Sequence, residues 1–178
     1  MLKIISENKA VVRFLVIFGG LYLILALLYK LYLGMEFSIN HFPDYFTHLV
    51  SVQSSEMVQV FGYSSKVEPH PFQESMKFFV NGEFLARIVE GCNAISVIIL
   101  FVSFIFAFYK DAKKTFLFAF AGAVFIYAIN IFRIALLAIG IYEYPEYSGF
   151  LHGTVFPAII YGTVFFLWFL WVKNFSKK

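Results

Sequence analysis

The chain has 178 residues, of which 61% are hydrophobic, 21% are aromatic and only 14% are charged. One small soluble domain cannot bury that much apolar surface, so the composition argues against a soluble globular protein and indicates a bilayer as the solvent. The net charge is only +3, and no basic face with interleaved aromatic residues occurs outside the flanks of the apolar stretches. Nucleic acid is therefore not expected as a partner.

Four stretches are long and apolar enough to cross a membrane, which takes about 20 residues. They cover approximately 11–33, 92–109, 115–140 and 152–172, and an outer loop of about 34–91 follows the first. The first stretch could be a signal peptide, but its length favours a permanent anchor. We therefore predict an all-α membrane protein with four transmembrane helices, forming a single integral membrane domain over 1–178.

Lysine and arginine residues flank these spans unevenly, and cytoplasmic flanks retain positive charge. One side of the predicted membrane collects three basic clusters, whereas the other side has few basic residues against nine acidic ones. The clusters are Lys3, Lys9 and Arg13; Lys110, Lys113 and Lys114; and Lys173, Lys177 and Lys178. Both termini should thus be cytoplasmic, which in a bacterial inner membrane makes the long loop periplasmic.

The outer loop begins with a predicted helix. Pro43 and Asp44 suit a helix start, and Gly62 suits a helix end. Between them, apolar residues recur at helical spacing, namely Phe42, Phe46, Leu49, Val50, Met57, Val60 and Phe61. This pattern predicts an amphipathic helix on the outer surface, which either caps the bundle or binds substrate.

A β-hairpin is predicted further along the outer loop. Pro69 and Pro71 mark an irregular stretch, after which two short apolar-rich runs flank Asn81-Gly82. An Asn-Gly pair in that setting is the strongest short-range signal for a hairpin, because both central residues of a type I′ turn need positive φ. The hairpin is either a lid or an edge that pairs with an extended peptide.

Three side chains of reactive types fall near the outer membrane face. Cys92 is the only cysteine and cannot form an intramolecular disulfide, so it is an inert buried residue, an intermolecular partner or a nucleophile. Arg133 lies inside the third span, where a charge costs about 2.5 to 3.5 kcal/mol. It either snorkels outward or, with Asn130 on the same helix face, marks a polar pocket. His152 opens the fourth span.

The predicted topology places Cys92 and His152 at helix N-termini, where positive partial charge favours a thiolate and disfavours an imidazolium. Acyl transfer would then use Cys92 as the nucleophile, His152 as base and acid, and Arg133 to hold the oxyanion or orient the peptide. Supporting candidates are Glu90, Asn93 and Asn130, which either tune this triad or serve capping and interhelical hydrogen bonding. No metal or other cofactor is expected, since His41, His48 and His70 lack ligand spacing.

The motifs Glu90-Gly-Cys-Asn-Ala94, Asn130-Ile-Phe-Arg-Ile134 and His152-Gly153 together resemble the exosortase/archaeosortase family, and the short length is most similar to its exosortase F branch. The resemblance implies a membrane-embedded cysteine transpeptidase or protease that cleaves a C-terminal sorting signal through a thioester and passes the protein to an envelope acceptor. It also implies catalytic roles for Cys92, Arg133 and His152. Many bacterial relatives have about twice as many spans and a further arginine near Ser96, so the motif recognised here could differ.

The partners expected on this basis are the sorting-signal helix of exported proteins, the lipid bilayer and a small adaptor subunit. Two other classes of function were weighed. A transporter needs polar residues through both leaflets, and the cytoplasmic halves of the spans are almost purely apolar. A non-catalytic membrane assembly factor or chaperone could use the same aromatic bundle to hold a partner helix, and it is the alternative to an enzyme.

Overall fold

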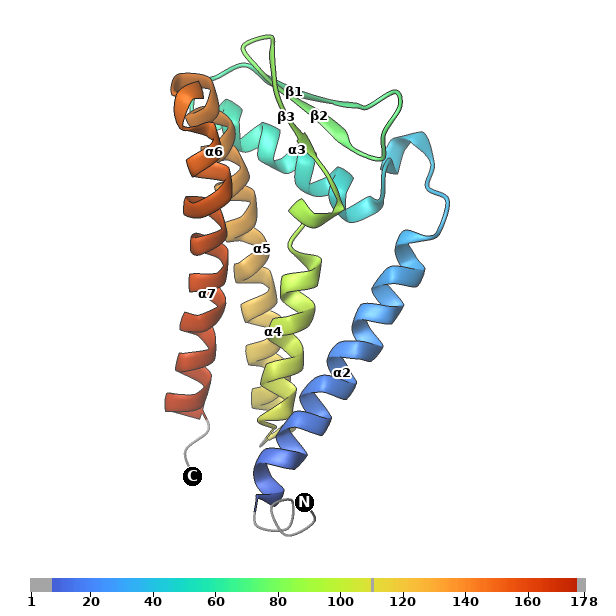
Figure 1. The fold of residues 1–178 in the computed structure, drawn as a ribbon, viewed down its shortest axis with the longest axis vertical. Helices are drawn as coiled ribbons and strands as arrows, with labels where there is room; N and C mark the ends of the chain where they lie inside the picture. Colours follow the sequence, from blue (N-terminus) through green and yellow to red (C-terminus); the bar gives the residue numbers. More distant parts are fainter. Residues whose placement is uncertain (1–7, 110, 176–178) are drawn as a thin grey trace. The chain divides into compact units, whose positions relative to one another are not determined.

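Helices dominate the computed structural model, which describes residues 8–109 and 111–175 (Figure 1). The helices are α2 (Lys9–Leu33), α3 (Tyr45–Val60), α4 (Ile95–Ala107), α5 (Ala112–Glu143), α6 (Ser148–Phe150) and α7 (Phe156–Leu170). The strands are β1 (Ser65–Pro69), β2 (Met76–Val80) and β3 (Glu83–Ile88). Short 3₁₀ turns cover Ile39–His41, Glu90–Cys92 and Pro145–Tyr147, and π-helical turns cover Leu151–Val155 and Trp171–Phe175.

Three helical segments in this part of the chain are long and apolar enough to cross a membrane: α2, α5 and the continuous helix Pro145–Lys173. The protein is thus a multi-pass membrane protein. The predicted spans 11–33 and 115–140 lie within α2 and α5, whereas the predicted span 152–172 begins too late, because the helix starts at Pro145. The remaining prediction, 92–109, corresponds to α4, whose 13 residues rise only about 20 Å, less than the hydrocarbon thickness of about 30 Å.

The chain divides into two compact units, each assembled from separate segments. Unit 1 combines Met1–Gly34, Ser96–Val124 and Val164–Lys178, and unit 2 combines Met35–Ile95 and Phe125–Thr163. A single domain over 1–178 therefore stays a prediction.

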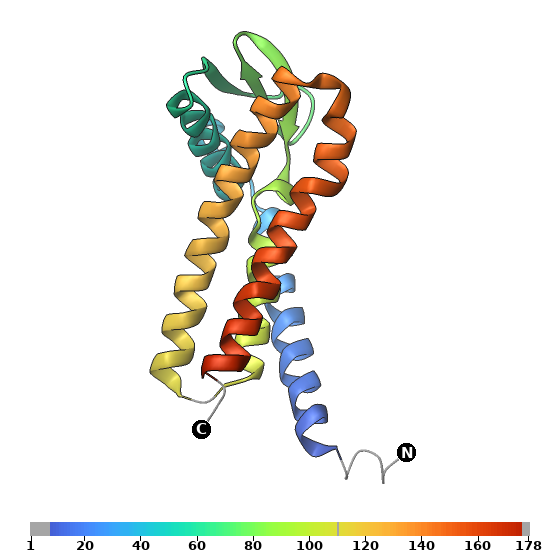
Figure 2. The same cartoon turned by 90° about the vertical axis from the view of Figure 1, so that its left-hand side faces the viewer.

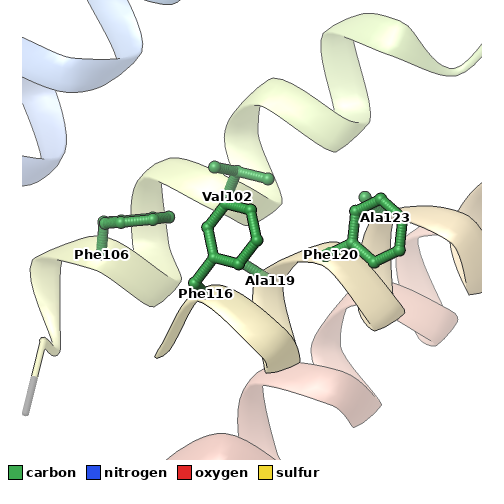
Figure 3. A pocket seen from close by; sticks show the side chains of 6 residues that line it. All are labelled: Val102, Phe106, Phe116, Ala119, Phe120 and Ala123. Carbon is green, nitrogen blue, oxygen red and sulfur yellow. The ribbon is translucent and has the colours of Figure 1, made fainter. Parts of the chain in front are cut away.

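Unit 1 is an apolar helical assembly with aromatic packing. The Phe104 ring stacks on Trp168 with centroids 4.2 Å apart, and Phe14 lies 4.6 Å from Phe108. Phe101 is completely buried. Between α4 and α5 runs an apolar groove of about 200 Å³ (Figure 3), lined by Val102, Phe106, Phe116, Ala119, Phe120 and Ala123. Hydrophobic side chains thus both fill this unit and cover much of its surface, as a helical assembly in lipid requires.

Most of the basic residues of unit 1 lie toward one end, whereas Lys30 lies in the last turn of α2, at the other end of that helix. Figure 2 shows the first turn of α2, the last turn of α4, the first turn of α5 and the last turn of α7 at the same end of this unit. Lys9, Lys113, Lys114 and Lys173 belong to these turns or follow them directly, and Arg13 follows one turn later. Lys3, Lys110, Lys177 and Lys178, which completed the predicted clusters, lie outside the described residues.

Unit 2 contains a three-stranded antiparallel sheet in the order β1-β2-β3. Asn81 and Gly82 connect β2 to β3 with φ of 49° and 87°, as a tight primed turn requires. One residue of β3 bulges opposite Phe78 and Phe79. β1 differs from the irregular stretch that Pro69 and Pro71 predict: Pro69 is the last residue of an edge strand, where proline is tolerated.

The core of unit 2 lies where the sheet meets α3 and the C-terminal half of α5. It consists of Val50, Val58, Met76, Phe78, Val80, Ile88, Ile134, Ala135 and Ala138. Figure 1 shows the sheet lying along one side of α3. Asp44 begins α3 as an N-cap, since its carboxylate accepts the N–H groups of Phe46 and Thr47 at 3.0 Å.

The buried face of α3 differs from the predicted apolar stripe. Its buried residues are Thr47, Val50, Ser51, Ser54, Ser55 and Val58, whereas Val60 is 78% exposed. Two of these hydroxyl groups are paired: Ser51 Oγ donates to the carbonyl of Thr47 at 2.7 Å, and Ser55 Oγ lies 2.8 Å from Oγ of Ser65 on β1. Close packing of small residues, rather than an amphipathic stripe, fixes this helix on the sheet.

Candidate active site around Cys92

Cys92, Arg133 and His152 line one cavity of about 50 Å³ within unit 2. The other lining residues are Phe78, Ala86, Arg87, Ile88, Ile134, Leu137 and Ala138. Three segments far apart in the chain therefore bring a thiol, a guanidinium and an imidazole to the same space. No hydrogen bond or ion pair joins these three side chains within residues 8–109 and 111–175.

The main chain of Cys92 is held from both sides. Cys92 ends the 3₁₀ turn Glu90–Cys92, and its N–H donates to the carbonyl of Val89 at 2.8 Å. Its own carbonyl accepts a hydrogen bond of 2.7 Å from Nδ2 of Asn130, a buried residue of α5. The buried side chain of Asn130 thus holds the main chain of Cys92 against α5, which is a structural role for one of the predicted supporting residues.

Asn93 fixes the chain immediately after the cysteine. Its Nδ2 donates to Oγ1 of Thr47 at 3.1 Å, and its Oδ1 accepts the N–H of Ile95 at 2.9 Å. Ala94, between them, has φ of 64° and is only 5% exposed. An alanine with its backbone in the left-handed region is destabilised by about 1 to 2 kcal/mol, and such strain persists only where surrounding contacts hold it. The chain therefore turns sharply from Cys92 into α4.

Arg133 lies ten residues before the end of α5 and is half-buried. Its Nε is buried without a hydrogen-bond partner among the described residues, and the same holds for Oδ1 of Asn130. These two residues are three positions apart and share a helix face. Because buried polar groups are nearly always paired, a free donor and a free acceptor near the cysteine indicate a site that binds a polar group.

The positions of Cys92 and His152 correct the argument from helix N-termini. Cys92 precedes α4 by three residues, and Asn93, not the cysteine, bonds to the first N–H of that helix. His152 lies about two turns inside the helix Pro145–Lys173, within the π-helical turn Leu151–Val155. Helix dipoles act within the first turn, so the argument from helix N-termini holds for neither residue.

Among the residues that the structure describes, no aspartate or glutamate lines the cavity, while Arg87, Arg133 and His152 all do. The surrounding walls are apolar, and charge interactions in such a medium are stronger than in water. An arrangement of this kind favours a negatively charged group, either the thiolate of Cys92 or an oxyanion formed during acyl transfer.

The remaining predicted residues lie outside the cavity. The carbonyl of Glu90 accepts the N–H of Asn93 at 3.2 Å, so this residue supports the turn through its main chain. The rings of His41 and His48 lie 6.3 Å apart, and Nδ1 of His70 accepts the N–H of Phe72 at 3.2 Å. Two residues that sequence reasoning missed are Thr47 and Arg87. A threonine in a helix and an arginine in a strand carry no local signal of such roles.

The fold and the cavity define a multi-pass helical membrane protein in which the single cysteine of the sequence lies beside an arginine and a histidine. The chain belongs to the transmembrane exosortase family, whose model matches residues 10–172. This confirms the resemblance at the level of the family. Searches of curated proteins and of solved structures gave no match. The family is generally one of cysteine transpeptidases, so a role related to protein sorting follows.

Proposed function

We propose that this protein is a membrane-embedded cysteine transpeptidase or peptidase that cleaves a C-terminal sorting signal of exported proteins and transfers them to an envelope acceptor. The observation that carries the proposal is the common cavity of Cys92, Arg133 and His152 in a member of the transmembrane exosortase family. Each residue supplies one of the three elements that acyl transfer needs: a nucleophile, a proton carrier and a charge that stabilises the oxyanion.

The first half-reaction forms a thioester. His152 takes the proton of the Cys92 thiol, and Sγ then attacks the carbonyl carbon of the scissile peptide bond. The guanidinium of Arg133 holds the oxygen as negative charge develops on it. When the C–N bond breaks, the leaving nitrogen takes the proton from His152. The sorting-signal helix departs with a free amine, and the exported protein stays attached to Cys92.

The second half-reaction releases the exported protein. An acceptor hydroxyl, amine or water gives its proton to His152 and attacks the thioester, the C–S bond breaks, and the Cys92 thiol regains the proton. A cavity of about 50 Å³ cannot admit a helix, whose diameter with side chains is about 10 to 12 Å. It therefore suits the reacting carbonyl, while the rest of the substrate lies outside it.

The short helix α4 is consistent with a fourth crossing that is only partly helical. We propose that the segment from Gly91 to Ala94 completes this crossing at membrane depth. Irregular backbone is tolerated there only when it is buried in protein or lines a cavity. Cys92 lines the cavity, and the hydrogen bonds of its N–H and carbonyl are made within the protein.

The same proposal includes location and partners. The basic residues at one end of unit 1 favour a bacterial inner membrane with both termini in the cytoplasm and the cavity facing the periplasm. The proposed partners are the sorting-signal helix of the substrate, the surrounding bilayer and a small adaptor subunit, and nucleic acid is not among them. Membership of the exosortase F branch is likewise a proposal.

Replacement of the cysteine tests the proposal directly. We expect Cys92→Ala and Cys92→Ser to insert at normal abundance and to abolish processing of co-encoded exported proteins that end in an apolar stretch and a basic tail. Immunoblots of these proteins in cells with each variant provide the measurement. Normal processing by Cys92→Ser would overturn the enzyme and favour the membrane chaperone, which does not need the thiol.

Arg133 is tested by charge-conserving replacement. Arg133→Lys keeps the charge but loses the planar fork that can hold a carbonyl oxygen through two donors, so processing should fall to the level of Cys92→Ser. Lys114→Arg, at the other end of α5, is a control that should process normally. Unchanged processing by Arg133→Lys would reduce this arginine to a membrane anchor.

A further inference from the structure

We infer that the exported polypeptide binds as an added strand on the free edge of β3, with an acidic side chain beside Arg87, and that this edge delivers the scissile bond to Cys92. The inference rests on the proposed function and names how its substrate is held. Three features of β3 support it: the position of the strand, the direction of its outward main-chain groups and the charges beside them.

β3 is an edge strand that borders the cavity. The sheet order β1-β2-β3 leaves its outer side unpaired within the described sheet. Ala86, Arg87 and Ile88 are consecutive, and all three line the cavity with Cys92. Side chains of successive strand residues point to opposite faces. Ala86 and Ile88 share one face of the sheet with Phe78, which also lines the cavity, whereas the side chain of Arg87 points to the other face. The cavity therefore lies against that face of the sheet and extends to Arg87 at its edge.

The pairing pattern shows which main-chain groups of β3 point outward. At the two ends of the β1–β2 pair, the N–H of His70 donates to the carbonyl of Ser75, and the N–H of Asn81 donates to the carbonyl of Ser64. Hydrogen-bonded pairs alternate with non-hydrogen-bonded pairs along an antiparallel ladder, so Glu68 and Lys77 also form a hydrogen-bonded pair. The N–H and carbonyl of Lys77 therefore point toward β1. Lys77 also stands opposite Arg87. Their pair is thus a non-hydrogen-bonded one, and the N–H and carbonyl of Arg87 point away from β2.

An extended polypeptide has a main-chain donor and a main-chain acceptor, and both can pair with such an edge. Cys92 lies four residues beyond Ile88, at the end of the same chain segment. A strand paired with Arg87 would therefore continue past the mouth of the cavity. The small volume of the cavity fits this arrangement, because it needs to receive only the reacting carbonyl.

Charge defines the occupant further. Lys77 and Arg87 stand directly opposite each other, and like charges in this position are destabilising. Glu68, the third residue of the same row, forms an ion pair with Lys66 at 2.7 Å, and the Arg87 guanidinium donates to Gln73. An acidic side chain on the added strand, next to Arg87, would offset the repulsion.

Cysteine cross-linking tests the added strand without depending on catalysis. The Cys92→Ser chain has no cysteine, so Arg87→Cys in that background introduces a single thiol. The probe is a cysteine-free form of the exported protein whose processing depends on Cys92, with single cysteines placed at successive residues around its cleavage site. Strand pairing brings Cα atoms within about 4.5 to 5.5 Å, the range in which disulfides form.

We expect oxidation to give disulfides at alternate positions of the probe. The residue of the exported protein that pairs with position 87, or its neighbour on the same face of the added strand, should be acidic in the natural sequence. Cross-links at every third or fourth position, or none, would overturn strand addition. The proposed function would still stand as long as Cys92→Ser fails to process the unmodified protein, so the two failures are distinguishable.

A proline pair provides a second measurement with a matched control. Arg87→Pro removes the outward N–H, whereas Arg87→Ala removes only the side chain. The proline variant should process at least about 10-fold more slowly than the alanine variant, because it loses one or two hydrogen bonds to the added strand. Phe84→Pro changes an outward position that does not line the cavity, and its processing should stay within about two-fold of wild type. Equal rates for the two Arg87 variants would contradict the inference.

Discussion

Unit 1 and unit 2 are stabilised in different ways. Unit 1 packs rings and aliphatic side chains, and its polar side chain Ser103 bonds only to its own helix, at the carbonyl of Ile99. Unit 2 is joined by side-chain hydrogen bonds between residues far apart in the chain. These bonds link Asn93 to Thr47, Asn130 to Cys92, Tyr127 to Gln53 and Tyr63 to Glu143. Apolar packing holds helices together, but directional bonds are needed to place one thiol.

This difference predicts that substitutions in the two units fail in different ways. A change in unit 1 should lower stability and leave the chemistry of the folded protein intact. A change in the hydrogen bonds of unit 2 should lower the rate by more than its effect on stability explains. The following substitutions test that contrast, beginning with the largest expected effect.

Asn130→Leu removes the donor that holds the carbonyl of Cys92. We expect processing to fall about 100-fold, because small displacements of a reacting group cost rates of that order. Alkylation of Cys92 by a maleimide, followed over pH, should change in rate as well. The control is Tyr127→Phe, one turn earlier in α5, which loses a 2.7 Å bond to Gln53 that does not reach Cys92. Equal losses in both variants would show that Asn130 supports only stability.

Gly122→Ala tests unit 1, where a new Cβ would come within 2.6 Å of Cε1 in the fully buried ring of Phe101. Overpacking of this kind costs about 1 to 3 kcal/mol, so the thermal midpoint in detergent should fall while processing per folded molecule stays normal. In α2, Gly19→Ala meets nothing within 4 Å and should be neutral or slightly stabilising. A rate defect in Gly122→Ala at full stability would break the contrast between the units.

Ala94→Gly should increase the stability of the protein, in contrast to Gly122→Ala. Glycine adopts the φ of 64° at this position without strain, so the free energy of unfolding should rise by up to about 1 kcal/mol. The same replacement in the middle of a helix of unit 1, Ala119→Gly, should lower it by about 1 kcal/mol. Chemical denaturation of the two variants gives the comparison. A loss of stability in Ala94→Gly would mean that no strain is relieved.

Tyr63→Phe should have the smallest effect, because it removes an exposed bond of 2.9 Å to Glu143. The hydrogen bond to Glu143 raises the pKa of Tyr63 above its ordinary value of 10.0. The folded state therefore holds this proton more tightly than the unfolded state does, and the contribution to stability is complete below pH 10 and declines as pH rises above it. Wild type should lose slightly more stability than Tyr63→Phe across that alkaline range. Identical curves would show that the bond contributes nothing.

Composition and local pattern predicted much of this protein. Length and apolar content indicated the spans that became α2 and α5, and the basic flanks marked their ends. Asn81-Gly82 adopts the positive φ values that its turn type needs. Three separate motifs also named Cys92, Arg133 and His152, which line one cavity. Their catalytic roles remain a prediction.

Other features depended on contacts that no local pattern carries. The buried face of α3 holds serines and threonine because the sheet packs closely there, and β1 exists because β2 pairs with it. The predicted span 92–109 begins at Cys92, yet α4 starts only at Ile95, whose N–H bonds to Oδ1 of Asn93. Residue types and their order along the chain are enough to indicate the bilayer as solvent and to name the reactive side chains. Which donor holds the cysteine, and which strand lies beside it, depends on the folded arrangement, since the bond from Asn130 to Cys92 joins residues 38 positions apart.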